Sequence, residues 1–209
     1  MRTGLAAGAF ATLAAALAAM AFAGHSDRAR AAPAAHDGPF GIYMGEPLSA
    51  LGKVTRSDPG FYVVTHPPRP SDSVPWVSVQ AYASTGVCAI MGMSDFYDDD
   101  PSGSQAIGRA DSLAAVLEGK YGPGEKYDSC DGDEDDCGAN WARTEHSGSA
   151  RYGYEWKPDQ ARLPDGVRLI RVAAVAVSAT STHAVVGYLS SNESGCSQAQ
   201  QQSGAASPF

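Results

Sequence analysis

Four cysteines place the strongest constraint on how this chain can fold. They stand at Cys88, Cys130, Cys137 and Cys196, and four cysteines allow three pairings. Cys130 and Cys137 bracket a six-residue acidic loop, so a local bridge is the simplest pairing and leaves Cys88 for Cys196. The second bridge would tie the C-terminal segment to a central strand. The alternatives are zinc binding and a cysteine nucleophile, but no paired C-x-x-C or histidine spacing supports zinc.

The first 23 residues decide among these alternatives because they predict the compartment. Arg2 is their only cation, residues 5–22 carry no charge, and Ala21-Phe22-Ala23 matches a small-x-small cleavage pattern, as in a secretory signal peptide. A membrane anchor is the alternative, but ten of the eighteen uncharged residues are alanine, which drives insertion weakly. We therefore expect an exported protein, periplasmic or extracellular, with no membrane span after cleavage. Export favours disulfides over metal or thiol chemistry.

The rest of the chain divides into a spacer, one domain and a tail. Residues 24–38 are small and polar and contain proline, and predict a disordered spacer. Residues 39–192 predict a single domain, and residues 193–209, rich in Ser, Gln and Ala, predict a disordered tail. Residues 24–209 carry 14 basic and 23 acidic side chains, a net charge of −9. This charge argues against nucleic acids and anionic membranes as partners, and permits a basic protein or a metal cation.

Hydrophobic periodicity and turn residues predict the elements of the domain. In order, they are a short helix at 47–51, strands at 61–65, 76–83 and 87–93, a helix at 105–121, and strands at 141–144, 152–156, 167–179 and 184–189. Antiparallel strands with helices on one face form a two-layer α+β fold. The order of elements repeats between halves at about 39–94 and 104–192. We therefore expect two tandem helix-plus-strand units that form one curved sheet, with helices on one face and the other face open for binding.

Two short motifs resemble a known group of exported proteins. The opener Ile42-x-Met44-Gly45-x-Pro47-Leu48-x-x-Leu51 is similar to the helix opener of the β-lactamase-inhibitor-protein-like superfamily, which includes small outer-membrane-assembly lipoproteins. The helix end Lys120-Tyr121-Gly122-Pro123 is similar to the end of a helix in that group. The resemblance implies helix-plus-sheet repeats and binding of other proteins without catalysis. The chain departs from the group at Glu46 and in its acidic disulfide loop, and no contact residue carries over by position.

The acidic loop is the sharpest candidate for a metal site. Asp131, Asp133 and Asp135 have the first three ligand spacings of a calcium loop. The glycine that should follow the third acid is absent, and Cys137 interrupts the segment that should lead to a glutamate. The alternatives are a solvated, self-repelling loop pinned by a disulfide and a docking site for a basic partner. We expect no cofactor other than this possible calcium ion.

A proline-dense loop and several aromatic residues are the candidates for contact with a partner protein. A stiff loop loses little conformational entropy on binding, and Tyr and Trp are frequent interface hot spots. The alternative for each aromatic residue is packing in the core beneath the helices. The candidate residues are Pro67, Pro68, Arg69, Pro70, Trp76, Tyr82, Tyr152, Tyr154 and Trp156.

No catalytic constellation is recognisable in the sequence. There is no G-x-S-x-G or HExxH motif, and the five histidines are scattered through the spacer and predicted loops. The sequence therefore favours an exported, disulfide-stabilised, non-catalytic protein that binds another protein, of the inhibitor, immunity or envelope-accessory type. The alternative is a secreted hydrolase whose carboxylate or histidine site has no sequence signature.

Overall fold

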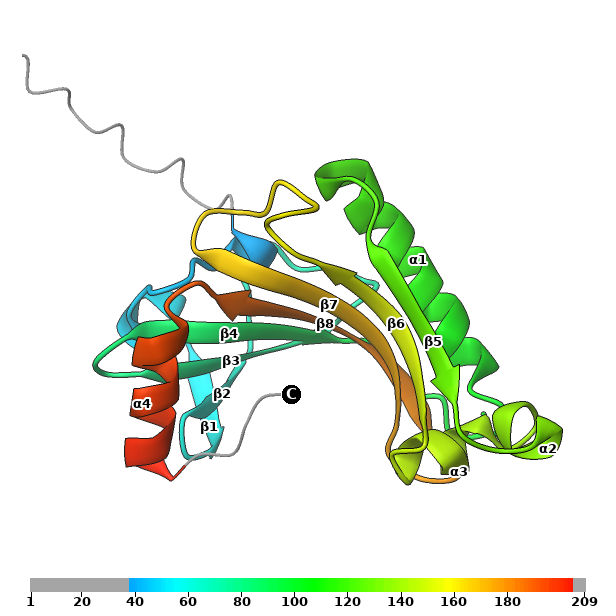
Figure 1. Cartoon of the computed structure of the whole chain (residues 1–209). Coiled ribbons are helices and arrows are strands. Elements are labelled where there is room, and N and C mark those ends of the chain that lie inside the picture. Colours follow the sequence, from blue (N-terminus) through cyan, green and yellow to red (C-terminus); the bar gives the residue numbers. More distant parts are fainter. Residues whose placement is uncertain (1–37, 205–209) are drawn as a thin grey trace, which may run out of the picture. The chain divides into compact units, whose positions relative to one another are not determined.

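The structure is a computed structural model that describes residues 38–204 (Figure 1). The predicted signal peptide and all but the last residue of the predicted spacer lie outside the described residues. The described part is a mixed α+β structure, with one eight-stranded antiparallel sheet, four α-helices and two short 3₁₀ helices. None of its helices is both long enough and apolar enough to cross a membrane.

The elements follow one another along the chain with short connections. They are η1 (Pro39–Gly41), η2 (Leu48–Leu51), β1 (Val54–Asp58), β2 (Phe61–Val64), β3 (Trp76–Tyr82), β4 (Gly86–Met93), α1 (Ser104–Tyr121), β5 (Glu125–Cys130), α2 (Glu134–Cys137), α3 (Trp141–His146), β6 (Ala150–Trp156), β7 (Val167–Ala176), β8 (Thr182–Ser190) and α4 (Glu193–Ser203).

The sheet consists of two four-stranded meanders joined edge to edge. Its strand order is β1-β2-β3-β4-β8-β7-β6-β5, and all neighbours are antiparallel. The joint is the pairing of β4 with β8, from Ala89 opposite Leu189 to Met93 opposite Val185. The first meander is preceded by the 3₁₀ helix η2 and the second by the 18-residue helix α1. The two halves therefore share their strand number but not their helices.

Helix α1 covers one face of the second meander, on the outer side of its bend (Figure 1). Its small residues Ala106, Ala110 and Ala114 are buried, so the helix lies close to the strands. The side chain of Trp156 on β6 is fully buried on this face, and its indole nitrogen donates a hydrogen bond to the carbonyl oxygen of Gly122. This layer forms a large part of the hydrophobic core, which continues into the first meander through Val77, Val79 and Ile90.

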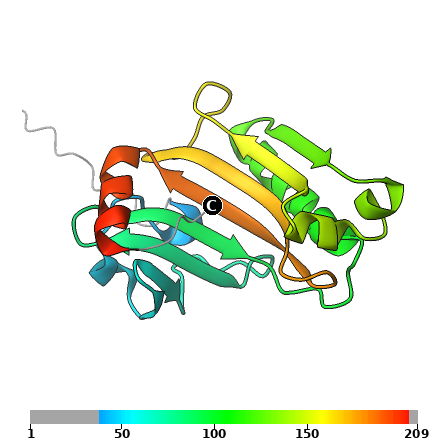
Figure 2. The same cartoon turned by 60° about the horizontal axis from the view of Figure 1, so that its bottom comes forward.

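The prediction that the helices share one face of the sheet is not confirmed. Successive side chains of a strand point to opposite faces, so Ile170 and Val172 of β7 face α1 while Leu169 and Arg171 point away from it. Residues of α4 line a hollow together with Leu169 and Arg171. Helix α4 therefore lies on the face opposite α1, at one end of the sheet (Figure 2).

The prediction that residue 193 begins a disordered tail is wrong as far as the structure describes it. Residues Glu193–Ser203 form α4, whose N-terminal amide at Gly195 is capped by the side chain of Asn192. Cys196 on this helix forms a disulfide with Cys88 on β4, and Cys130 forms one with Cys137, so the predicted pairing is confirmed. The composition of this segment gives a weak helix signal, and its attachment to β4 holds it against the sheet.

The remaining differences from prediction concern short or polar elements. Residues 141–144 belong to the six-residue helix α3 and not to a strand. Trp141 and Ala142 are apolar because this short helix buries them. The edge strands β1 and β5 were not predicted. Both are polar, as exposed edge strands tend to be, and neither shows the alternation of a half-buried strand. Strand β7 ends at Ala176, ahead of the 177–181 turn.

Candidate functional site

The face of the sheet opposite α1 is the candidate functional site, and we call it the open face. In the second meander it carries Arg171, Ala173 and Val175 of β7 and their neighbours Val185 and Leu189 of β8. Among residues 38–204, α4 lies at one end of this face and α3 at the other, and the middle has no helix over it (Figure 2).

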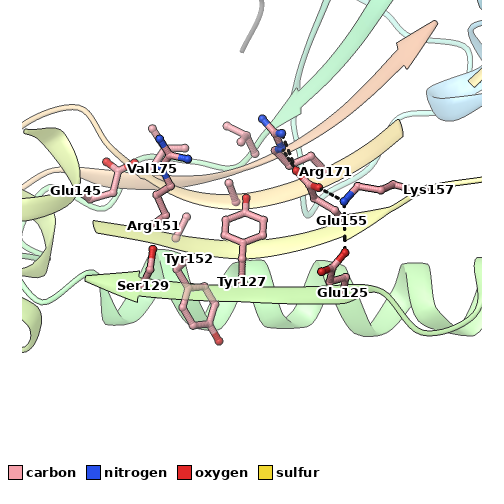
Figure 3. A pocket seen from close by; sticks show the side chains of 13 residues that line it. Glu125, Tyr127, Ser129, Glu145, Arg151, Tyr152, Glu155, Lys157, Arg171 and Val175 are labelled. Carbon is pink, nitrogen blue, oxygen red and sulfur yellow. Dashed lines mark hydrogen bonds and ion pairs between the residues drawn. The ribbon is translucent and has the colours of Figure 1, made fainter. Parts of the chain in front are cut away.

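A cavity of about 740 Å³ lies on the open face over β5, β6 and β7 (Figure 3). Its floor is aliphatic and its walls carry charged and hydroxyl groups. The lining side chains on this face are Glu125, Tyr127, Ser129, Glu145, Arg151, Glu155, Lys157, Arg171, Ala173, Val175 and Val185. The volume lies in the range of small-molecule sites, but the cavity is a broad hollow on the surface of the sheet.

A network of fixed charges crosses the cavity at the end near α4. Both Nε and one terminal nitrogen of Arg171 donate to the same Glu155 oxygen, at 2.9 and 2.6 Å. Lys157 contacts the other Glu155 oxygen at 3.0 Å and Glu125 at 3.3 Å. Burial alone would raise the pKa of Glu155, but hydrogen bonds from Lys157 and Arg171 outweigh it and hold that pKa below its usual value. Glu155 therefore carries a charge at neutral pH and is not poised to exchange a proton.

Tyr127 crosses the middle of the cavity and reaches two strands away. It lies over Gly153 on the neighbouring strand, and its hydroxyl donates a hydrogen bond of 3.3 Å to the carbonyl oxygen of Val172. Burial raises the pKa of Tyr127 to about 12, so the phenol stays protonated and keeps its donor. The ring is thus a fixed aromatic group on the open face.

Glu145 closes the other end of the cavity from helix α3. One of its carboxylate oxygens accepts a hydrogen bond of 2.7 Å from the backbone nitrogen of Ala176, at the end of β7. Burial raises the pKa of Glu145, although this hydrogen bond and the nearby His146 and Arg151 act in the opposite direction. The hydrogen bond shows that the carboxylate joins α3 to the sheet.

The structure separates the predicted partner-binding residues into three groups. Tyr152, Tyr154 and Trp156 face α1, and the hydroxyls of both tyrosines donate to Asp111 of that helix. Tyr152 and Trp156 are buried in the core and Tyr154 is half-buried against it, so the structure favours the alternative of core packing for these three residues. The alternation of residues in the sequence places these three aromatic side chains on one face of β6. It does not indicate which face of the sheet a helix covers.

Trp76 alone of the predicted aromatic anchors lies on the open face with much of its side chain exposed, at 53%. Tyr82 is half-buried at the far end of β3, where its hydroxyl accepts a hydrogen bond from Gln80. The proline loop connects β2 to β3 and is mostly exposed, with the backbone of Arg69 bonded to Phe40. The loop members are Pro67, Pro68, Arg69 and Pro70.

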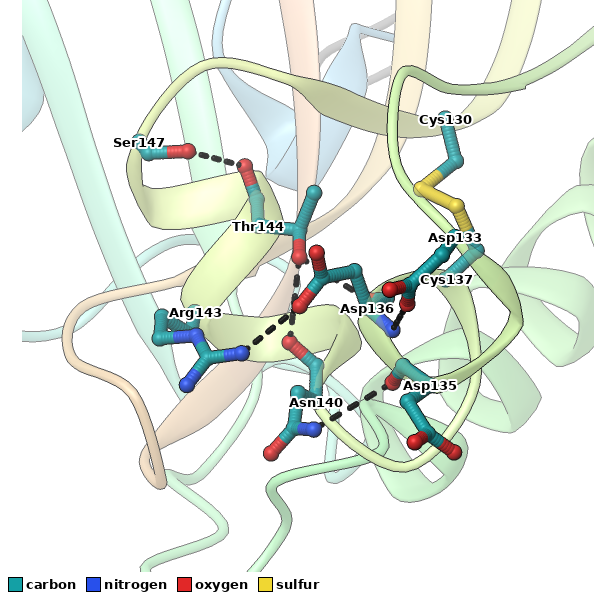
Figure 4. Close-up of polar contacts among 9 residues, drawn as sticks. All are labelled: Cys130, Asp133, Asp135, Asp136, Cys137, Asn140, Arg143, Thr144 and Ser147. Carbon is teal, nitrogen blue, oxygen red and sulfur yellow. Dashed lines mark hydrogen bonds and ion pairs between the residues drawn. A yellow bond between two sulfur atoms is a disulfide. The ribbon is translucent and has the colours of Figure 1, made fainter.

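The acidic loop does not form the predicted calcium site. Among the described residues, no three Asp, Glu, His or Cys side chains gather in a way that could hold a metal ion. Asp133 instead caps helix α2 by accepting from the backbone nitrogen of Asp136, and Asp136 pairs with Arg143 at 2.6 Å (Figure 4). A helix rotates successive side chains apart. Asp135 lies two residues after Asp133, little more than half a turn around α2, so the two carboxylates point in different directions (Figure 4).

Comparison with known proteins adds no identification. No protein-family model, no curated protein and no solved structure matches the chain.

Sequence reasoning missed the charged and aromatic groups that occupy the open face. Arg171 interrupts the otherwise apolar residues 169–176, and Glu155 stands between the aromatic residues Tyr154 and Trp156. A charged residue inside an apolar strand indicates that one face of that strand is not part of the core, and Arg171 and Glu155 give this indication in the sequence. Nothing local in the sequence indicates that Tyr127 lies over Gly153, because that contact depends on the pairing of β5 with β6.

Proposed function

We propose that this is an exported, disulfide-stabilised, non-catalytic protein that binds another protein through the open face, in the manner of an inhibitor, immunity or envelope-accessory protein. The apolar character of the open face at the centre of the sheet carries the proposal. An antiparallel sheet with one solvated face alternates apolar and polar residues. Strands β7 and β8 instead place Ala173, Val175, Val185 and Leu189 on the face opposite α1.

The groups around this apolar floor suit a protein interface. Interface hot spots are enriched in Trp, Tyr and Arg, and the open face carries Trp76, Tyr127 and Arg171. Two of these side chains are already held in place, Tyr127 by its hydrogen bond to Val172 and Arg171 by Glu155. A side chain that is ordered before binding loses less entropy when a partner docks. The two joined meanders, with the resemblance of the helix motifs, support the proposed relation to the β-lactamase-inhibitor-protein-like superfamily.

One observation favours the alternative of a secreted hydrolase. The carboxyl of Glu145 faces the cavity with a raised pKa, and raised carboxyl pKa values occur at catalytic sites. Its hydrogen bond to Ala176 gives the carboxylate a structural role without catalysis. Turnover of an ester, peptide or glycoside substrate that disappears in Glu145→Gln, while the variant stays folded, would establish the hydrolase instead.

Site-specific photo-cross-linking in the producing cell tests the proposal. A photo-reactive phenylalanine derivative replaces Ala173 or Ser129 on the open face, or Val116 on α1 as the matched control. Val116 is 71% exposed, so the control position is accessible from solvent. We expect a discrete adduct with one protein from the open-face positions and none from Val116. If the open-face positions give no adduct, the proposal is wrong.

A further inference from the structure

Three of the four large hydrophobic side chains that are exposed in the described residues gather at one end of the open face. They are Trp76 at 53%, Phe96 at 51% and Val177 at 43%, whereas Val116 lies alone on α1. Single exposed apolar residues are normal on soluble proteins, but a contiguous group marks an interaction surface.

The strand register shows that the group is contiguous. Trp76 pairs with Met93, Met93 with Val185, and Val185 with Ala173, so one row of apolar side chains crosses four strands. The next row along the open face holds His183 and Val175, which pair with each other. We call the set at this end the apolar patch: it consists of Trp76, Met93, Phe96, Val175, Val177 and Val185.

Phe96 is ordered on this surface although half of its side chain is exposed. Its ring packs on the imidazole of His183, with centroids 4.8 Å apart and planes inclined by 52°. His183 is 94% buried beneath it, and its Nδ1 has no hydrogen-bond partner among the described residues. A buried polar atom without a partner destabilises the free protein. The Phe96 ring therefore packs at the centre of the apolar patch, directly over the imidazole whose Nδ1 has no hydrogen-bond partner among the described residues.

Acidic side chains border the patch on the side of the 94–103 segment. Asp95 precedes Phe96, and Asp98 accepts a hydrogen bond of 3.1 Å from the hydroxyl of Ser181, whose carbonyl oxygen accepts from the Val177 amide. Asp95, Asp98 and Asp99 are all exposed. The cation on the opposite border is Arg151, next to Glu145 at the edge of the cavity (Figure 3).

We propose that the apolar patch is the docking centre of the open face, and that its partner is a protein surface with a central apolar side chain flanked by lysine or arginine on the side that meets Asp95 and Asp98. This inference rests on the proposed function and adds where on the face the partner docks and what chemistry it presents. The net charge of −8 for the whole chain also draws basic partners toward it. Protein interfaces usually consist of an apolar centre surrounded by a polar or charged rim, and the patch with its acidic border has this arrangement.

The test uses the full-length protein with the same photo-reactive residue at Phe96 or Val177, and at Ser129 as a control on the same face outside the patch. Both patch residues are exposed, so the substitutions should leave the fold intact, which circular dichroism checks. We expect abundant adducts at Phe96 and Val177 with one protein, and a weaker adduct at Ser129. The cross-linked peptide of that protein should contain lysine or arginine close to an apolar residue.

A second experiment tests whether the acidic border attracts the partner, in the protein that carries the photo-reactive residue at Phe96. Asp95→Asn together with Asp98→Asn should lower the adduct yield severalfold, as should added salt, because both weaken attraction between exposed charges. Asp72→Asn, an exposed carboxyl in the loop before β3, is the matched control and should leave the yield unchanged.

The remaining outcomes separate this inference from the proposed function. Adducts at Ser129 or Ala173 without adducts at Phe96 and Val177 would overturn the inference and leave the proposed function standing. An adduct with a second copy of this chain, a cross-link to residues 205–209 of the same chain, or a partner peptide without basic residues would also overturn it. The absence of adducts at every open-face position would overturn both.

Discussion

A buried hydrogen bond of 2.7 Å joins the hydroxyl of Thr182, on β8, to the carboxylate of Asp100, which precedes α1. The same Asp100 oxygen accepts from the backbone nitrogens of Gln105 and Ala106, and its other oxygen accepts from the hydroxyl of Ser104. Asp100 thus satisfies the free amides at the start of α1 and ties that helix to the strand beneath the apolar patch.

Asp100→Ala should destabilise the protein by about 3 kcal/mol, because it removes a charged acceptor and leaves buried donors without partners. Asp99→Ala is the matched control, since Asp99 is exposed and adjacent, and should change stability by less than about 0.5 kcal/mol. Chemical denaturation measures both values. Equal effects of the two substitutions would show that the buried hydrogen bonds do not stabilise the helix start.

Gly153→Ala should destabilise the protein by about 1–3 kcal/mol through overpacking. A Cβ at this position would lie 2.1 Å from the carbonyl oxygen of Val172 and 2.5 Å from the hydroxyl of Tyr127, so backbone and ring must both shift. Gly108→Ala is the control of opposite sign. Gly108 lies inside α1 with nothing within 4 Å of a new Cβ, and alanine there should stabilise by about 0.5–1 kcal/mol. Thermal or urea unfolding shows whether the signs differ as expected.

The two disulfides should contribute unequally to stability. Cys88–Cys196 closes a loop with a separation of 108 residues and Cys130–Cys137 one of 7. The chain-entropy model gives about 5 kcal/mol for the long loop and about 2.5 kcal/mol for the short one. We expect the double substitution to alanine at 88 and 196 to cost more, and to raise hydrogen exchange in α4 selectively. If the 130 and 137 pair costs as much, or α4 stays protected, the long bridge does not anchor the helix.

His183 should make the protein less stable as the pH falls below about 6.5. Burial lowers the pKa of its imidazole below the ordinary 6.5, so the unfolded chain takes up a proton at a higher pH than the folded chain. The stability it contributes is complete above the unfolded pKa and is lost as the pH falls toward the folded one. The ring faces Phe96 and Val175, and burial is the cause of the lowered pKa, with no charged side chain of the described residues contributing to it.

Urea unfolding between pH 7.5 and about pH 5 measures this dependence in the wild type and in His183→Leu. The leucine variant fills a similar volume without a titrating group, so its free energy of unfolding should depend less on pH over this range. The substitution also removes the buried Nδ1 that has no hydrogen-bond partner among the described residues. Identical pH profiles for the two proteins would show that His183 is not buried in its neutral form.

Local pattern was sufficient for the elements with a strong period. The alternation in residues 76–83, the apolar run after Val167 and the 3-4 spacing in α1 predicted strands and a helix where the structure has them. The short acidic loop and the even cysteine count predicted both disulfides. Each of these features depends on residues that are close in sequence, or on the chemistry of one residue type, and so can be recognised without a fold.

The tertiary structure alone decided which faces are covered and which side chains meet. Period-two alternation assigns Tyr152, Tyr154 and Trp156 to one side of β6, but only the packing of α1 makes that side the core. The weakly helical segment of α4 is ordered by a disulfide to a strand more than 100 residues away. The apolar patch likewise draws on β3, β4, β7, β8 and the turns that follow β4 and β7. The net charge and the cysteine pairing can be read from the sequence itself, whereas the candidate interface exists only because long-range strand pairing brings its residues onto one surface.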